Sequence, residues 1–397
     1  MARPIVEVAG VFRRHGKRYR EQHTLPLQQL KLMRAIETCR TAELGGHVER
    51  CSHCPHQRIA YNSCRNRHCP KCQNRERGRW LERRKAELLP VEYFHVVFTK
   101  PEQLNALALQ NKTVLYRILF QASAQTLLTI AADPRHLGAR LGFFSILHTW
   151  GQNLLLHPHV HCVVTGGGLS ADGSAWISCR PGFLLSVHVL SRLFRRLFLE
   201  ALDKAFQDGQ LSFHGKLELL DEPRQFQQLL NTLRAMEWVV YAKPPFGGPG
   251  QVLDYLGRYT HRVAISNNRL LSEDQEQVRF RYKNYRAHQS QQKRTMTLAA
   301  DEFIRRFLLH TIPPGFQRIR HYGLLASRTK RTTLNHCRSL LGATHNDLLP
   351  TAADIALSLP GLTQDLLRCP ECGIGQMLRI ETIPPPRVPL LRSFDSS

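Results

Sequence analysis

The sequence predicts an α+β fold in which helices lie on one face of a sheet, joined to a small N-terminal metal-binding module and a basic helical C-terminal region. The middle of the 397-residue chain mixes strand-like apolar segments with amphipathic helical ones, and the strands do not require crossover connections. Cysteine pairs lie near both ends of the chain. Positive charge is concentrated in two blocks that flank the middle.

The charge distribution indicates a polyanionic partner, most simply a nucleic acid. The net charge is +24, of which residues 1–90 carry +12 and residues 279–331 carry +11. General solubility is the alternative, but charge confined to two blocks fits a binding footprint better. The chain has no apolar run of about 18 residues and no signal-peptide pattern, so we expect a cytoplasmic protein with no membrane partner.

Composition divides the chain into four parts. Residues 1–90 form a basic segment with a zinc-binding module, and residues 91–285 form the mixed α+β domain. Residues 286–375 form a basic helical region with one Cys-x2-Cys pair, and residues 376–397 form a proline-rich, extended tail. Apolar periodicity predicts helices at residues 27–36, 75–89, 104–131, 186–207, 223–236, 250–259 and over much of 300–350, and strands at residues 93–99, 143–150, 154–169, 238–242, 263–266 and 278–282.

The N-terminal module contains the strongest metal signal in the sequence. Cys51 and Cys54 form one Cys-x2-Cys pair, and Cys69 and Cys72 form a second. Each pair offers two thiolates from one tight turn, so the two pairs together suit a single tetrahedral structural zinc ion. Eleven cysteines without a signal peptide favour metal binding over disulfides, with free core cysteines as the alternative.

Four residues between these pairs are further candidates. Cys64 and His68 could replace one ligand of the zinc site or begin a second site. Arg65 and Arg67 are expected to contact DNA phosphates, so that the zinc module presents arginines to a nucleic acid. A purely structural zinc module is the alternative.

Cys369 and Cys372 form another Cys-x2-Cys pair close to the C-terminus. Because one pair cannot saturate a zinc ion, it either borrows ligands from elsewhere in the chain or is a remnant.

Residues 154–169 are an apolar run with three histidines, which we expect to be a buried strand. Gly166, Gly167 and Gly168 predict the turn that ends it. Side chains two apart on a strand point to the same side, so His159 and His161 face one way and form half of a divalent-metal site. Two hydrogen-bonded core histidines are the alternative.

Two histidines leave a divalent ion short of protein ligands. Gln152 lies seven residues before His159, across a possible bend of the strand, and its carbonyl oxygen makes it our predicted third ligand. His157 shares the strand parity of the two histidines and is the alternative. Mg²⁺ or Mn²⁺ suits a partly hydrated site around a phosphate.

A second set of reactive side chains occurs at residues 254–262. On a helix, Tyr255 and Tyr259 would project together, and Arg258 and Arg262, also four apart, could hold phosphates. With a divalent ion polarising a DNA phosphate, a tyrosine can attack in line and release the sugar 3′ oxygen, leaving a 5′-phosphotyrosine. Two tyrosines packed in a helix without chemistry are the alternative.

These motifs together resemble those of the HUH endonucleases, in which a His-x-His strand precedes a helix that carries tyrosines. With the cysteine module and the stretch Tyr-Leu-Gly-Arg-Tyr-Thr-His-Arg-Val-Ala-Ile-Ser at 255–266, the chain resembles the two-tyrosine rolling-circle transposases of the insertion sequence 91 family. Residues 280–285 and the stretch Glu-Phe-Ile-Arg-Arg-Phe-Leu-Leu-His at 302–310 belong to the same resemblance. It runs from about residue 20 to residue 375.

The resemblance implies a five-stranded antiparallel sheet with the histidines on a central strand and the tyrosines on a helix. It implies an enzyme with a catalytic divalent ion that cuts and rejoins single-stranded DNA, both at the ends of its mobile element and at target sites. Rival interpretations are a plasmid replication initiator or conjugative relaxase with the same chemistry, a zinc-dependent DNA-binding regulator without catalysis, and an RNA-binding protein.

Overall fold

The computed structural model describes residues 6–73, 87–243, 264–283, 293–326, 330–342 and 368–386. Its main feature is an antiparallel sheet of five strands in the order β11-β4-β5-β3-β7, with a short strand, β6, pairing to β5. The predicted α+β class and antiparallel sheet are therefore confirmed. The strands are β3 (Tyr93–Thr99), β4 (Arg140–Trp150), β5 (Leu156–Leu169), β6 (Trp176–Ser178), β7 (Val240–Lys243) and β11 (Ile319–Gly323).

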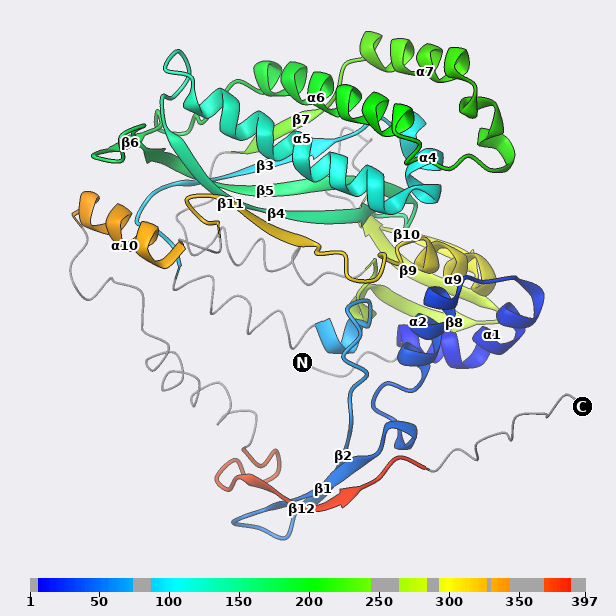
Figure 1. Cartoon of the computed structure of the whole chain (residues 1–397). Coiled ribbons are helices and arrows are strands. Elements are labelled where there is room, and N and C mark those ends of the chain that lie inside the picture. The colour runs from blue at the N-terminus through cyan, green and yellow to red at the C-terminus, as the bar shows by residue number, and fades with distance from the viewer. Residues whose placement is uncertain are drawn as a thin grey trace, which may run out of the picture.

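One face of this sheet is covered by helices, which form the upper layer in Figure 1. Alternate residues of the central strand, Val160, Cys162 and Val164, are buried in the largest core of the protein. They pack against apolar side chains of the helices, and this burial is the main stabilising contribution to the domain. The helices of this layer are α4 (Asn105–Gln110), α5 (Lys112–Ala132), α6 (Val187–Gln207) and α7 (Pro223–Ala235).

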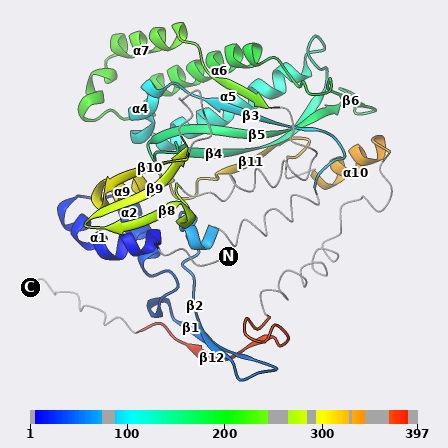
Figure 2. The ribbon, with the colours of Figure 1, turned by 180° about the vertical axis from the view of Figure 1, so that it is seen from behind.

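The opposite face carries a smaller core and the predicted histidines. Phe144, Ile146 and Val163 on this face pack with Leu334 of helix α10 (Lys330–Leu340). Helix α10 lies on the side of the sheet away from α5 and α6 in both views (Figure 1, Figure 2). The described helices therefore cover the two faces of the sheet unequally.

Helix α5 is the one helix in the described ranges that is long and apolar enough to cross a membrane. Two thirds of its apolar stretch, 67%, is buried inside the protein, where α5 packs on α6 and on strands β4 and β5. Its composition therefore reflects its place in the core.

A second core joins the N-terminal helices to residues 264–308. Helices α1 (Val8–Gln22), α2 (Leu27–Glu37) and α9 (Ala300–Leu309) pack against a three-stranded sheet, order β10-β9-β8, of which Phe280 is a central buried residue. The strands are β8 (Leu270–Asp274), β9 (Gln277–Lys283) and β10 (Lys293–Ala299). This sheet continues across the domain boundary that we predicted between residues 285 and 286, because β9 and β10 are hydrogen-bonded neighbours.

A third unit lies apart from these cores at the bottom of Figure 1. It is a sheet in the order β12-β1-β2, made of β1 (Gly46–Cys51), β2 (Gln57–Tyr61) and β12 (Met377–Ile383). The last strand belongs to the segment predicted as a proline-rich tail, so part of that tail is a paired strand.

Several predicted elements need correction. The glycines of β5 do not end the strand, which continues to Leu169. A Cβ on Gly168 would lie 2.2 Å from the carbonyl oxygen of Arg140, and one on Gly167 would lie 2.5 Å from that of Ile177. Glycine is therefore needed where neighbouring strands approach closely. Residues 264–266 are not a strand, and residues 300–350 include β11 besides α9 and α10.

Candidate functional site

The two predicted metal ligands lie on the central strand of the main sheet. His159 and His161 are on the same face of β5, as alternation predicted, and this face is the one opposite helices α5 and α6. The centroids of the two rings are 4.8 Å apart, with an interplanar angle of 61°. The sheet therefore presents two imidazoles on a rigid support.

A third imidazole, which our sequence reasoning missed, completes the cluster. His148 of β4 is directly opposite His159 in the β4–β5 pairing, and it is 2% exposed. Each of the three histidines offers a nitrogen, and these nitrogens all lie within 4.8 Å of one another. His148 could have been found from the register of the β4–β5 hairpin, because it is the residue opposite His159 when the two strands are paired across the turn at residues 151–155.

Neither of the two candidates for a third ligand belongs to this group of three histidines. Gln152 lies in the turn, where its backbone carbonyl accepts a hydrogen bond from Arg269 at 2.5 Å. His157 contributes its backbone carbonyl, which accepts a hydrogen bond from His159 Nδ1 at 2.6 Å. The role of the Gln152 side chain as a ligand stays a prediction, and His148 is the better placed residue.

Hydrogen bonds at the Nδ1 atoms orient the imidazole rings of His159 and His161. The bond from His159 Nδ1 leaves its Nε2 for a ligand. His161 Nδ1 lies 2.7 Å from His95 Nε2, and the two rings are stacked at an interplanar angle of 4°. When His161 binds through Nε2, its Nδ1–H donates to His95, which is the usual second-shell support of a metal-binding histidine.

Burial keeps two of the histidines at this site neutral at pH 7. Burial, with a contribution from His157, lowers the pKa of His159 to about 3, and burial together with nearby Lys243 lowers that of His95 to about 4. Burial also lowers the pKa of Lys100, which lies next to the strand residue paired with His159, to about 7. Neutral imidazoles are the form that binds metal ions.

The donor set fits a divalent transition ion. A metal about 2.1 Å from each of three imidazole nitrogens requires those nitrogens to be about 3–4 Å apart, and the nitrogens of this triad all lie within 4.8 Å of one another. Three nitrogen donors without a carboxylate are softer than Mg²⁺ prefers, so of the two predicted ions Mn²⁺ fits better.

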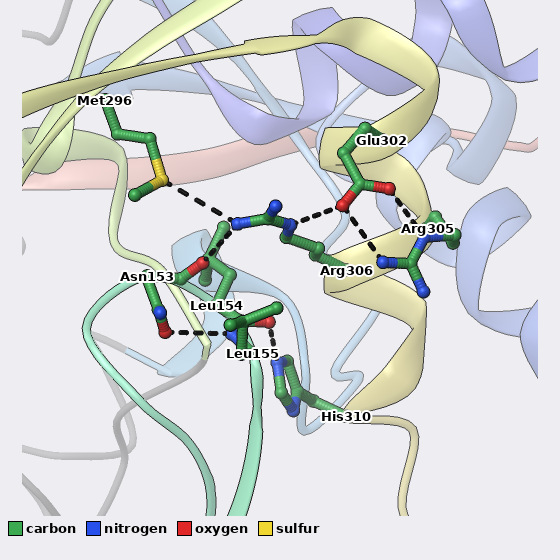
Figure 3. Close-up of polar contacts among 8 residues, drawn as sticks. All are labelled: Asn153, Leu154, Leu155, Met296, Glu302, Arg305, Arg306 and His310. Atoms are coloured by element: carbon green, nitrogen blue, oxygen red, sulfur yellow. Dashed lines mark hydrogen bonds and ion pairs between the residues drawn. The ribbon is translucent and has the colours of Figure 1, made fainter.

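Helix α9 fixes the turn that joins the two metal-site strands (Figure 3). Arg306 Nη1 donates to the carbonyl of Asn153 at 3.0 Å, and His310 Nε2 donates to that of Leu154 at 3.0 Å. Leu154 is fully buried with a φ of +63°, a conformation that a leucine adopts only when its surroundings hold it. Glu302 accepts from Arg306 Nε at 2.5 Å and so directs its guanidinium to the turn.

The stretch 302–310, which we singled out in the sequence, therefore has a structural role. Glu302 and Arg306 of α9 and His310 at its C-cap recur every four residues and lie on one side of the helix. His310 also lies 3.2 Å from Thr149 Oγ1, and its ring packs against Trp150, which stacks on His148 at 4.8 Å between centroids. A chain of contacts thus links α9 to the third imidazole.

The cysteines form two clusters of four, and their division corrects our prediction. We predicted a single site made of Cys51, Cys54, Cys69 and Cys72. In the structure the first pair and the second pair belong to different clusters. The two pairs lie in different structural units, so their spacing along the chain does not define a site. One cluster contains Cys39, Cys64, Cys69 and Cys72, and the other contains Cys51, Cys54, Cys369 and Cys372.

The first cluster is part of the second core. Cys39 and Cys69 are 0% and 1% exposed, and the Sγ atoms of Cys39 and Cys64 are each 3.6 Å from that of Cys72. Cys64 is thus a member, as proposed, whereas Cys39 was missed because it lacks a Cys-x2-Cys partner. Its position just after α2 brings it to the cluster.

His68 and Arg67 serve the packing of the protein. His68 accepts a hydrogen bond from the backbone N–H of Ile312 at 3.1 Å through Nε2, and its Nδ1 faces Asn66, so it is not a zinc ligand. Burial lowers its pKa to about 3. The guanidinium of Arg67 donates to the carbonyls of residues 312, 313 and 316 at 2.6–3.3 Å, and its DNA contact stays a prediction. Arg65 is exposed, and its DNA contact stays a prediction.

The predicted nucleophiles Tyr255 and Tyr259, with Arg258 and Arg262, lie outside the described residues. The described chain before them ends at Lys243 of β7, which pairs with His95, the residue hydrogen-bonded to His161.

Comparison with known proteins identifies the class. A family model described as "Putative transposase" matches residues 142–333, and one described as "Transposase zinc-binding domain" matches residues 11–100. The fold and its metal-ligand clusters are thus those of a transposase with an N-terminal zinc-binding domain. The chain belongs to the insertion sequence 91 family of transposases.

Two curated relatives cover most of the chain. "Putative transposase y4qJ" of Sinorhizobium fredii (strain NBRC 101917 / NGR234) is 59% identical over 387 residues, which are 96% of each chain. "Transposase for insertion sequence element IS801" of Pseudomonas savastanoi pv. phaseolicola is 29% identical over 340 residues, 84% of this chain and 79% of the relative.

Solved structures offer a weaker likeness. Two complexes of the conjugative relaxase TrwC with oriT DNA, one metal-free and one metal-bound, match with a TM-score of 0.22 and 12% identity. They cover 42% and 43% of this chain and 71% of the relaxase chain. A TM-score this low does not establish a shared fold.

Proposed function

We propose that this transposase nicks and rejoins single-stranded DNA through a 5′-phosphotyrosine intermediate, in rolling-circle transposition of its own element. The observation that carries the proposal is the triad His148, His159 and His161 on adjacent central strands. Membership of the transposase family supplies the DNA substrate class. The lysines and arginines of the two basic blocks provide positive charge that can bind DNA phosphates.

The histidines would hold a divalent ion through three nitrogen atoms, His159 and His161 through Nε2. When bound, this ion supplies positive charge that stabilises the phosphate in the transition state. His95 and the backbone carbonyl of His157 hold the rings of His161 and His159 through their Nδ1 atoms, and Lys243 adds positive charge beside His95.

Tyr255 and Tyr259 are the proposed nucleophiles. A phenol oxygen attacks the phosphorus, a phosphotyrosine bond forms, and the bond to the sugar 3′ oxygen breaks. The phenol proton is lost as the 3′ oxygen gains one. Attack by a 3′-hydroxyl on the phosphotyrosine reverses these changes and joins the strands. Two tyrosines permit two successive transfers, with Arg258, Arg262 and Arg65 as proposed phosphate contacts.

The first cysteine cluster is the proposed structural zinc site. Its four thiols lie at the separations of a tetrahedral thiolate site, and all four residues belong to the segment matched as a zinc-binding domain. It connects the end of α2 to residues 64–72 and so fastens the N-terminal helices.

The test is to incubate the protein with a labelled single strand from one end of its element, in the presence of Mn²⁺. A covalent protein–DNA adduct that forms only with the divalent ion is the expected result. An adduct that forms equally well in a chelator would contradict the metal role. A relaxase or replication initiator predicts cleavage at one origin, whereas a transposase acts on both ends, so ends from both sides are compared. A regulator without catalysis predicts binding and no adduct.

A further inference from the structure

The second cysteine cluster joins residues from opposite ends of the chain. Cys51 and Cys54 lie at the end of β1 and in the turn that follows, and Cys369 and Cys372 lie just before β12. Cys51 Sγ is 3.7 Å from Cys372 Sγ, and Cys54 Sγ is 3.7 Å from Cys369 Sγ. These pairs are separated by 321 and 315 residues along the sequence, and the family model for a zinc-binding domain ends at residue 100.

The sulfur geometry matches a single metal ion. In a tetrahedral site with Zn–S bonds of about 2.3 Å, sulfurs are separated by about 3.8 Å. A disulfide would instead require a separation of about 2.0 Å, and all four cysteines are free. The four Sγ atoms lie within 4.8 Å of one another, so one ion can contact them all.

The two cysteine turns have matching backbone geometry. The N–H of Cys54 points to Cys51 Sγ at 3.4 Å, and the N–H of Gly375 points to Cys372 Sγ at 3.4 Å. Backbone donors aimed at sulfur favour the thiolate form that metal ions require. A Cβ on Gly375 would lie 2.4 Å from Cys51 Sγ, so a glycine is required for the two turns to meet.

Little else holds this unit together. Its buried apolar cluster consists of Cys51, Cys369 and Met377, with Cys54 and Cys372 at its edge. Leu378 and Ile380 of β12 are 52% and 46% exposed, although β12 pairs with β1 along its length. Such a small core cannot by itself order two distant segments, whereas metal binding can supply the required free energy.

We propose that Cys51, Cys54, Cys369 and Cys372 bind a second zinc ion, which fastens the C-terminal strand β12 to the N-terminal hairpin β1–β2. This site is separate from the cluster that contains Cys39. The sequence left open how the pair Cys369 and Cys372 could complete a zinc site, and in this proposal Cys51 and Cys54 supply the other two ligands. The proposal does not depend on the nuclease chemistry.

The test is a zinc count on the full-length protein purified under reducing conditions. The wild type is expected to contain about two zinc ions per chain, and the double variant Cys369→Ser with Cys372→Ser about one. Cys179→Ser is the matched control, because this free cysteine lies outside both clusters, and it should keep two. Cys372→His, which retains a zinc-ligating side chain, should also keep two.

Hydrogen exchange provides the second measurement. In the double serine variant, amides of β1 and β12 should lose protection, while those of β4 and β5 keep it. A double variant that still binds two ions would overturn the proposal, as would a wild type that binds only one. If the double variant does not fold, the wild-type count and the Cys372→His count still decide between these outcomes.

Discussion

Arg306 donates a hydrogen bond from its guanidinium to the backbone carbonyl of Asn153, at 3.0 Å, and so ties helix α9 to the turn between the two strands that carry the histidine triad. Together with His310, it holds a turn in which Leu154 has a positive φ. The spacing between His148 and His159 depends on this turn, because they are opposite residues in the β4–β5 hairpin.

We predict that Arg306→Ala weakens the site without removing any ligand. Loss of the bond to Asn153 lets the turn relax, so the Mn²⁺ concentration for half-maximal DNA cleavage should rise about tenfold, as for other residues that support metal ligands. The control is Arg305→Ala on the same helix, since Arg305 contacts Glu302 and not the turn (Figure 3). Equal Mn²⁺ dependence in the two variants would show that the turn is not held by Arg306.

The third ligand is decided by a comparison of His148→Ala with Gln152→Ala. We expect the first to lose metal-dependent cleavage and at least about a hundredfold in Mn²⁺ affinity, because it removes one of three nitrogen donors. The second should bind Mn²⁺ nearly as the wild type does, measured by calorimetry. The reverse order would reinstate Gln152 as the ligand and leave His148 as a packing residue.

His95 is predicted to act through His161. Replacement by alanine removes the acceptor for His161 Nδ1–H, and Mn²⁺ affinity should fall by about 10- to 100-fold. Glutamine can accept the same hydrogen bond through its side-chain oxygen, so His95→Gln should recover part of the affinity while His95→Leu should not. Identical affinities in the glutamine and leucine variants would contradict a role through this hydrogen bond.

Local patterns predicted the strands that build the site. Residues 93–99 match β3 in the structure, and the alternation of β5 correctly placed His159 and His161 on one face. Both follow from a run of apolar residues and from the alternation of side-chain direction along a strand, which can be recognised in a short stretch of sequence. His148 was within the predicted strand at residues 143–150, but its role depends on the register of a hairpin whose turn includes a leucine with positive φ.

The cysteine partition could not be derived in the same way. Eight cysteines divide into two groups of four in many ways, and the spacing favoured the two nearest pairs. The actual division follows the tertiary structure: Cys39 is delivered by the end of α2, and Cys369 by the pairing of β12 with β1. Contacts between residues more than 300 apart leave no local pattern to read.

The tyrosines are tested by the double variant Tyr255→Phe with Tyr259→Phe. Phenylalanine keeps the ring and removes only the attacking oxygen, so the covalent adduct with labelled single-stranded DNA should disappear while binding of the strand is retained. Each single variant should retain one adduct-forming residue. An adduct recovered from the double variant would assign the attacking group to another residue.

His310, the buried C-cap residue of α9, predicts a pH dependence of stability. Burial lowers the pKa of His310 to about 3, below the value of about 6.5 in an unfolded chain. As the pH falls below 6.5, the unfolded state binds a proton that the folded state does not, so this residue lowers the free energy of unfolding progressively down to about pH 3. Between pH 7.5 and pH 5 the loss is about 2 kcal/mol.

His310→Gln, which keeps a donor for the Leu154 carbonyl, should be less stable at pH 7.5 but show a smaller decrease on acidification in urea-unfolding measurements. His136→Gln, on an exposed turn, is the control. A decrease in His310→Gln as large as in the wild type would mean that other groups account for the acid sensitivity.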